Sequence, residues 1–336
     1  MKMTGLSRLT ETLRWRTTDR RCCMPMVFGY AANAAGISLK DALTQTDALV
    51  SSQIIAQRLF GYDAVHVYGG SVTEVESFGV PLVFPETDYP YIDPDYKPVN
   101  EDALADQPLP DPTRHGRMPY LLKSVKTLRQ EIGRQVPVVA VVTGPVTVGA
   151  QIVGLETMLM GFVEQPERSR RYLEKISLLS RNLALAMVDA GAHVIMIMDP
   201  VSSQSIMPPE VFRRFSLPLL QNIFRSCREA GVLACCLTIT GKVDGFFPLY
   251  PDIGADIVTL DYEVDPAQAF HRLPNLVIQG NIRPLDFVEG HPDDIKKECK
   301  NLLHLAESRP GYILAAGCEL PLNSKQANVE AMIGST

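Results

Sequence analysis

One cysteine near the end of the chain, Cys318, occupies a position where a thiol could do chemistry. The run from Tyr312 to Leu314 favours a β-strand, and Gly317 permits a sharp turn because it has no Cβ atom. Side chains just past the ends of strands carry the chemistry in many α/β folds. Cys318 is therefore a candidate nucleophile or metal ligand. The alternative is a buried, inert cysteine, since free cysteine also behaves as a small apolar residue.

Other polar side chains follow apolar runs that are typical of strands. Asp199 ends the run VIMIM and precedes Pro200. A lone carboxylate there must be wet or paired, because burying it alone is costly. Asp199 is thus a catalytic candidate, with a helix cap or an ion pair as the alternative. Asp261 has the same standing as Asp199, and the remaining strand-end candidates are expected to bind substrate: Tyr68, Thr238, Thr240 and Asn281.

Two further residues could join Cys318 in a zinc site. Alternation along a strand puts Cys236 on the same face as Thr238. If that face is the lumen of a barrel, Cys236 could approach Cys318, and His66 from another strand could be a third ligand. Zinc takes thiolate and imidazole ligands, and a catalytic site keeps one position open. The alternative is that Cys235 and Cys236 are a core pair, because no CxxC motif is present.

Strand and helix patterns alternate without interruption from residue 136 onward, which indicates parallel strands joined by crossover helices. We predict an α/β fold, a TIM-like (β/α)8 barrel that forms one domain over residues 1–336. Residues 80–118 are rich in Pro, Asp and Tyr and form a predicted excursion over the mouth of the barrel. A doubly wound sheet is the alternative, but no GxGxxG follows a strand. The expected strand centres are Met26, Val65, Val138, Ile195, Cys235, Ile257, Val277 and Ile313.

Composition narrows the class of protein further. The 336 residues carry a net charge of -6, which argues against a nucleic acid or an anionic membrane as the main partner. No apolar run reaches the roughly 18–20 residues that span a bilayer. The seven cysteines are scattered and odd in number, so we expect reduced thiols and a cytoplasmic location.

Six segments of the chain carry a family resemblance. They are Glu74–Gly79, 143–156, 189–203, 253–265, 279–284 and 311–321. Together they resemble the uroporphyrinogen decarboxylase superfamily, and more closely its methylcobamide:thiol methyltransferase branch. The resemblance covers nearly the whole chain and implies a TIM-like barrel.

Two departures from the family pattern matter. The decarboxylases have an Arg-rich first segment that grips porphyrin carboxylates, whereas this chain has MVFGYAANAAG, and the aspartate that follows the next strand falls on Gly70. The methyltransferase branch holds zinc with a His-x-Cys-Gly motif and a last cysteine. Cys318 matches that cysteine, but Thr238 and Thr240 replace the other two ligands, and hydroxyls are poor zinc ligands. Zinc is then either held by Cys318, Cys236 and His66 or lost.

The resemblance implies a methyltransferase that moves a methyl group between a small molecule and the cobalamin of a separate corrinoid protein. Methylcobalamin or cob(I)alamin would come from that partner, since the barrel uses the whole chain. Asp199 and Glu156 are the predicted catalytic residues, and Glu76 joins the predicted substrate-binding set. Two alternatives stay open. One is a decarboxylase acting on a small acid, and the other is a barrel that lost its metal and its catalysis. The first predicts cations in the mouth: Arg114, Arg117 or Lys242.

Overall fold

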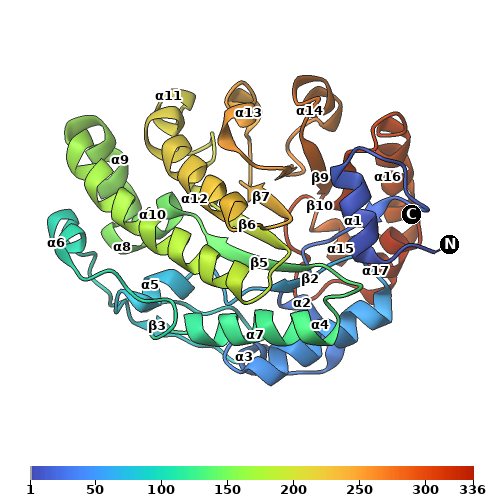
Figure 1. Ribbon diagram of the computed structural model, residues 1–336, viewed down its shortest axis with the longest axis horizontal. Coiled ribbons are helices and arrows are strands. Elements are labelled where there is room, and N and C mark those ends of the chain that lie inside the picture. Colours follow the sequence, from blue (N-terminus) through green and yellow to red (C-terminus); the bar gives the residue numbers. More distant parts are fainter. Residues whose placement is uncertain (1) are drawn as a thin grey trace.

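The computed structural model describes residues 2–336 and shows eight parallel strands curled into a TIM-like sheet with helices outside it (Figure 1). The strand order is β1-β10-β9-β8-β7-β6-β5-β2. The predicted fold class is confirmed. The strands are β1 Cys22–Cys23, β2 Val65–Val67, β5 Val138–Thr143, β6 Val194–Met198, β7 Ala234–Thr238, β8 Ile257–Thr259, β9 Val277–Ile282 and β10 Tyr312–Ala316.

Alternation along the strands divides the buried side chains into two layers. In β5, Val139 and Val141 belong to an inner cluster that fills the lumen, whereas Val138 and Val142 belong to the larger cluster between sheet and helices. Because both faces are covered, the strand reads as a continuous β-branched run. The inner layer turns polar toward the carboxyl ends of the strands. Its members there include Thr238, Thr259, Gln279 and Asn281, all buried.

Helices form the outer layer and connect successive strands. The long helix α10 packs against α8 on one side and α12 on the other. The principal helices are α2 Tyr30–Ala35, α3 Leu39–Ala42, α4 Thr46–Phe60, α5 Thr73–Ser77, α7 Met118–Glu131, α8 Pro145–Val153, α9 Leu155–Glu164, α10 Pro166–Asp189, α11 Pro209–Val211, α12 Leu217–Glu229, α13 Tyr250–Ile253, α14 Pro266–Arg272, α15 Asp286–Glu289, α16 Pro292–Leu305 and α17 Gln326–Ile333. The short helices η1 Pro200–Ser202, η2 Phe212–Ser216 and η3 Asp244–Phe246 lie in the loops after β6 and β7.

The excursion over residues 80–118 contains a two-stranded antiparallel hairpin, β3 Leu82–Val83 with β4 Tyr91–Ile92, and helix α6 Glu101–Asp106. The tip of the hairpin lies against the carboxyl ends of β1 and β2. The amide of Gly29 donates a hydrogen bond to the hydroxyl of Tyr89 at 2.7 Å. Gly70 has φ +91°, and a Cβ there would lie 3.3 Å from Pro90. The hairpin tip therefore covers part of the barrel mouth.

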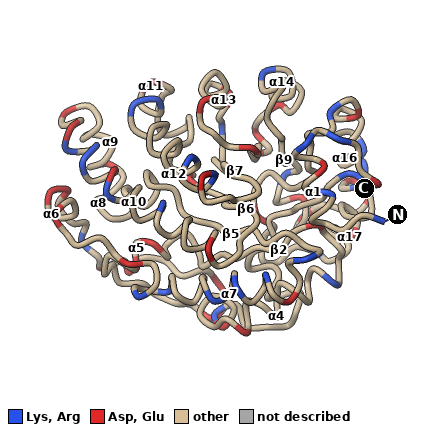
Figure 2. Tube along the Cα trace, in the orientation of Figure 1, with Lys and Arg blue, Asp and Glu red and all other residues tan. Residues whose placement is uncertain are grey.

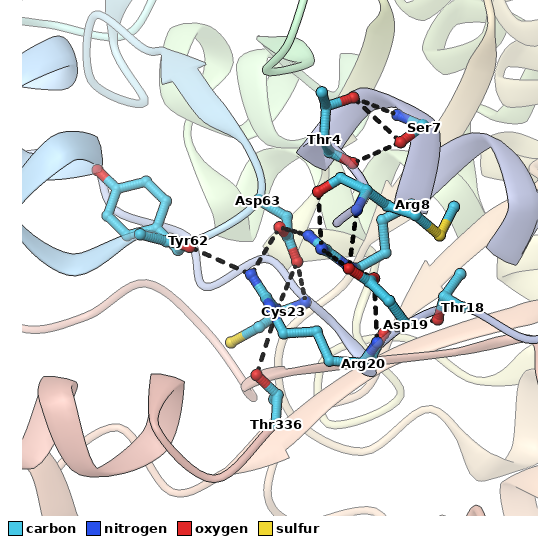
Figure 3. A network of polar contacts seen from close by, with 12 residues as sticks. Thr4, Ser7, Arg8, Thr18, Asp19, Arg20, Cys23, Tyr62, Asp63 and Thr336 are labelled. Atoms are coloured by element: carbon cyan, nitrogen blue, oxygen red, sulfur yellow. Dashed lines mark hydrogen bonds and ion pairs between the residues drawn. The ribbon is translucent and has the colours of Figure 1, made fainter. Parts of the chain in front are cut away.

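The amino ends of the strands, which we call the base, are closed by helix α1 Gly5–Leu13. Leu9 of this helix is fully buried in the lumen cluster. Asp63, just before β2, accepts hydrogen bonds from Arg8, Arg20 and the amide of Cys23 (Figure 3). The amide of Asp63 also donates to the carbonyl of Cys23 at 2.8 Å. Asp63 thereby links β1 to β2 at the seam of the sheet.

Charged residues of both signs are spread over the outer helices and loops, and β5, β6 and β7 carry none (Figure 2). Within residues 2–336, no single helix has the length and apolar character needed to cross a membrane. Helices α8 and α9 meet the criteria of length and apolar composition only when they are counted together, and a bend of 107° separates them.

Candidate active site

The carboxyl ends of the strands, which we call the mouth, bring together residues that are distant in sequence. Tyr68 follows β2, Thr240 follows β7, and Cys318 and Glu319 follow β10, and all four side chains are partly exposed. Tyr89 of the hairpin tip lies beside them, with its ring centroid 6.0 Å from that of Tyr68. The mouth is therefore accessible between aromatic rings on one side and the end of β10 on the other.

Cys318 is held at the mouth by the close approach of β10 to the loop after β8. The amide of Gly317 donates to the carbonyl of Ile282 at 2.8 Å, and a Cβ at Gly317 would lie 2.6 Å from the amide nitrogen of Tyr262. Burial, and then the charges of Glu319 and Asp261, raise the pKa of the Cys318 thiol to about 12. At neutral pH the group is a thiol, and nothing in its surroundings activates it as a thiolate.

The other two predicted metal ligands lie deeper. Cys236 is buried below Thr238, with its Sγ 3.7 Å from the hydroxyl of Thr259, and burial raises its pKa to about 12. His66 is 1% exposed, its ring meets Phe28 edge-on at 5.3 Å, and neither ring nitrogen has a hydrogen-bond partner. Burial lowers the pKa of His66 to about 3, so the ring is neutral at pH 7.

These three residues do not form a ligand set in the structure. Throughout residues 2–336, no group of three or more His, Cys, Asp or Glu side chains is placed to hold a metal ion. The physical reason is register, because Cys236 lies two residues before Thr238, in the layer beneath the mouth. The donor set does not fit a zinc ion, so we derive no chemical step through a metal.

The two threonines take different positions. Thr238 is buried, and its hydroxyl lies 3.0 Å from that of Thr259 in the neighbouring strand. Thr240 is partly exposed at the rim of the mouth. The next amide, Gly241, donates to the Asp261 carboxylate at 2.9 Å, which joins the loops after β7 and β8. Thr240 therefore lies at the rim of the mouth and Thr238 beneath it, and contact of either residue with substrate stays a prediction.

The side chain of Asn281 holds the loop after β8 in place. Its side-chain nitrogen donates to the carbonyls of Asp261 at 3.0 Å and Val264 at 2.7 Å, so the loop after β8 is fixed against β9. Asn281 also lines a groove of about 840 Å³ between that loop and α16, which Cys318 and Glu319 do not line. This placement gives Asn281 a role in shaping the loop at the mouth, and its contact with substrate stays a prediction.

The two predicted catalytic carboxylates have different surroundings, since one is buried and the other is exposed. Asp199 is fully buried and accepts hydrogen bonds from the amide and hydroxyl of Thr147, at 2.8 and 2.6 Å, and from Ser202 at 2.9 Å. Burial raises its pKa despite these bonds. A Cβ at Gly144 would collide with its side chain, so Asp199 is tightly enclosed. Glu156 is exposed in the first turn of α9. Catalytic roles for both stay predictions.

Helix α5 presents two carboxylates with different partners. Glu76, the residue predicted from sequence, pairs with Arg117 at 2.8 Å. Glu74 is 2% exposed, and one of its oxygens accepts from the amide of Thr143 at 2.7 Å while the other has no partner. Burial raises the pKa of Glu74 to about 7. Sequence reasoning assigned no role to Glu74. Residues two positions apart in a helix lie about 200° apart around its axis, so Glu74 and Glu76 point to different sides of α5.

Glu319 is the second carboxylate that sequence reasoning did not assign. It follows Cys318, and its segment is fixed by a bridge to Met26. Burial raises the pKa of Glu319 to about 7, although a hydrogen bond from Tyr89 opposes the shift, and the nearby charge of Asp88 adds to it. A carboxyl with a pKa near neutrality at a barrel mouth can hold or release a proton under working conditions.

Comparisons with known proteins agree with this architecture. A family model described as uroporphyrinogen decarboxylase matches residues 4–336. A methylcobamide:CoM methyltransferase, MtaA of Methanosarcina barkeri, is 26% identical over 305 residues, which cover 89% of this chain and 87% of that protein. A uroporphyrinogen decarboxylase of Crocosphaera subtropica is 28% identical over 301 residues, covering 87% of this chain and 82% of its own.

A solved structure of a methyltransferase from Methanosarcina mazei superposes with a TM-score of 0.89 at 24% identity, covering 99% of this chain and 98% of the other. A B12-independent methionine synthase from Shewanella has a TM-score of 0.57 at 13% identity, covering 86% of each chain. Both likenesses establish the TIM-like fold.

Proposed function

This chain belongs to the uroporphyrinogen decarboxylase family, and from that premise we propose that it is a methyltransferase. It would move a methyl group between a small molecule and the cobalamin of a separate corrinoid protein. Relatives named as methylcobamide:CoM methyltransferases support this proposal, and one of them aligns over 89% of the chain. We place the reaction in the cytoplasm, which agrees with the free state of all seven cysteines.

The charge of the mouth is the observation that carries the proposal. In residues 2–336, no Arg or Lys forms an ion pair with Glu319, Glu74 or Asp261. A porphyrinogen with many carboxylates would meet negative charge there. Of the cations considered for a decarboxylase, Arg117 is bound to Glu76, Arg114 pairs with Asp111, and Lys242 is exposed after β7. The mouth therefore favours a substrate that is neutral or positively charged.

The corrinoid, when its carrier protein docks, supplies the cobalt that accepts or donates the methyl group. The chain's own residues do the remaining work. Tyr68 and Tyr89 bound the space that a small substrate would occupy, and the loop held by Asp261 and Asn281 shapes its far side. Glu319 can hold or give a proton to the group that gains or loses the methyl.

The test is methyl exchange followed by cobalamin absorbance. Purified protein is incubated with methylcobalamin and thiols, and separately with cob(I)alamin and methylated donors. We expect protein-dependent interconversion of the two cobalamin spectra, and its absence with every substrate would favour a decarboxylase or a non-catalytic barrel. Metal analysis runs in parallel. We expect no stoichiometric zinc, and about one equivalent of zinc that is lost in Cys318→Ala would show that the ligands rearrange to bind it.

A further inference from the structure

Three aromatic rings from different segments form one wall of the mouth. The ring of Phe28, after β1, lies 4.5 Å from that of Tyr68, and Tyr68 lies 6.0 Å from Tyr89. Phe28 is buried, whereas Tyr68 and Tyr89 keep part of their surface exposed. Aromatic faces carry negative partial charge, so such a wall attracts cations and is indifferent or unfavourable to anions.

Two carboxylates that form no salt bridge among the described residues, Glu319 and Glu74, lie next to this wall, and of these Glu74 feels the charge of Arg117. The charge of Glu319 acts on both Tyr68 and Tyr89, and that of Glu74 acts on Tyr68. Asp88 adds a third negative charge near Glu319. Glu319 forms no salt bridge among the described residues, and one oxygen of Glu74 is buried without a partner. Leaving such groups unpaired is costly, and a bound cation would offset that cost.

The surroundings select the kind of cation. A metal ion does not fit, because the described residues contain no cluster of three ligands. A primary ammonium must satisfy three hydrogen bonds. The wall offers mainly rings, and the partly exposed Met198 packs against the same lumen cluster as Tyr68 and Tyr89. A quaternary ammonium has no N–H to satisfy and is recognised by aromatic faces and diffuse negative charge.

His66 is consistent with this choice. Alternation along β2 puts its side chain on the lumen face with that of Tyr68, against Phe28. Both of its ring nitrogens lack hydrogen-bond partners although the residue is 1% exposed. Because burial keeps the ring neutral at pH 7, His66 adds no positive charge beneath the wall.

We propose that the mouth, walled by Phe28, Tyr68 and Tyr89 and lined by Glu319, with Glu74 buried behind Tyr68, binds a small quaternary ammonium compound as the methyl donor. This inference rests on the proposed methyltransferase function. In the transfer, one C–N bond breaks and its electron pair stays on nitrogen, which leaves as a neutral tertiary amine. The methyl group is taken by a cob(I)alamin nucleophile on the partner protein, and Co(I) supplies both electrons of the new bond.

Calorimetric titration of the intact protein with choline tests the proposal, with 3,3-dimethylbutan-1-ol as the neutral analogue of the same shape. We expect choline to bind at least tenfold more tightly than the neutral analogue. Tyr89→Leu and Glu319→Gln should each weaken choline binding by about tenfold, in line with cation–π and ion-pair strengths. The matched controls are Tyr91→Leu, on the exposed side of the same hairpin, and Glu330→Gln, on α17. Both should leave binding unchanged.

Equal binding of choline and the neutral analogue, or no choline binding by folded protein, overturns the proposal. Circular dichroism of each variant establishes that it is folded. The titration contains no cobalamin, so its outcome is separate from that of methyl exchange. Choline binding without methyl exchange would support a quaternary ammonium site at the mouth but overturn its role as the methyl donor, together with the methyltransferase function. Methyl exchange from a neutral donor, without choline binding, would overturn the quaternary ammonium site and leave the methyltransferase function standing.

Discussion

The carboxylates at the base of the barrel are paired with arginines, whereas Glu319 at the mouth has no cationic partner. At the base, Asp63 is 2% exposed and its oxygens are shared between Arg8, Arg20 and the amide of Cys23 (Figure 3). Asp19 accepts from Arg8 at 2.9 Å, and this bond holds the pKa of Asp19 below its usual value. At the mouth, Glu319 has no cationic partner and its pKa is raised to about 7.

The carboxylates at the base of the sheet therefore contribute to stability, and the carboxylate at the mouth is available for function. Paired carboxylates at the base hold α1 against the seam between β1 and β2. The unpaired carboxylate at the mouth costs stability and gains an ability to bind cations and exchange protons. Paired charges at the amino ends of the strands and an unpaired carboxylate at the carboxyl ends agree with the division expected for barrel enzymes, whose active sites lie at the carboxyl ends of the strands.

Removing the Asp63 carboxylate from the base should have the largest effect on the free energy of unfolding. Asp63→Ala removes a shared acceptor from Arg8, Arg20 and the Cys23 amide, and removing one partner of a buried ion pair costs about 3 to 5 kcal/mol. Urea unfolding measures the change in the free energy of unfolding. Asp111→Ala is the control, because that carboxylate is on the surface, and its effect should be small. A loss below about 1 kcal/mol in Asp63→Ala would contradict the role given to the base.

The pH dependence of stability should distinguish the two regions. The folded-state pKa of Glu319 is above its unfolded value, so its contribution is present at low pH and is lost as pH rises from about 5 to 8. The stability difference between wild type and Glu319→Gln should therefore fall by about 1 to 2 kcal/mol over that range, allowing for partial exposure. For Asp19 the sign is reversed, because its lowered pKa gives stability that is lost below about pH 4.

Urea titrations at several pH values measure both differences, with Asp19→Asn as the variant for the base. A flat difference curve for Glu319→Gln between pH 5 and 8 would show that this carboxyl is already ionised or paired in the folded protein.

The smallest expected effect comes from the hydroxyl of Tyr89. Tyr89→Phe keeps the ring but removes the group that accepts from Gly29 and donates to Glu319. Because that bond stabilises the ionised carboxylate, its loss should raise the pKa of Glu319 further. Choline affinity measured between pH 6 and 9 should shift its midpoint upward by a few tenths of a pH unit, with affinity at high pH changed less than about threefold. An unshifted midpoint would mean that Glu319 does not control the charge of the mouth.

Much of the fold followed from local pattern, whereas much of the site did not. Seven expected strand centres lie inside observed strands, because apolar β-branched runs bounded by Gly and Pro are local signals. The first strand is wrong by about three residues: β1 ends at Cys23, and Met26 makes only an isolated bridge to Glu319. The uniformly apolar run CCMPMVF has no period that could fix its register.

The candidate site was also only partly predictable from local sequence pattern. Strand-end positions such as Cys318 and Tyr68 were predictable because parallel strands end at one face. The contact between Tyr89 and Glu319 joins residues 230 positions apart through a loop, and no local pattern encodes it. The depth of Cys236 likewise depends on the stagger between strands, which is why the three predicted metal ligands do not meet.

The most direct measurement is the absorbance of cob(I)alamin incubated with the protein and tetramethylammonium chloride. We expect loss of the Co(I) band and gain of the methylcobalamin spectrum, with trimethylamine formed in equal amount. The rate at low tetramethylammonium concentration should fall by about tenfold in Glu319→Gln, because the donor binds more weakly, and should stay unchanged in Tyr91→Leu. A Co(I) band that decays no faster with the wild-type protein than without it would contradict methyl transfer from a quaternary ammonium at this mouth.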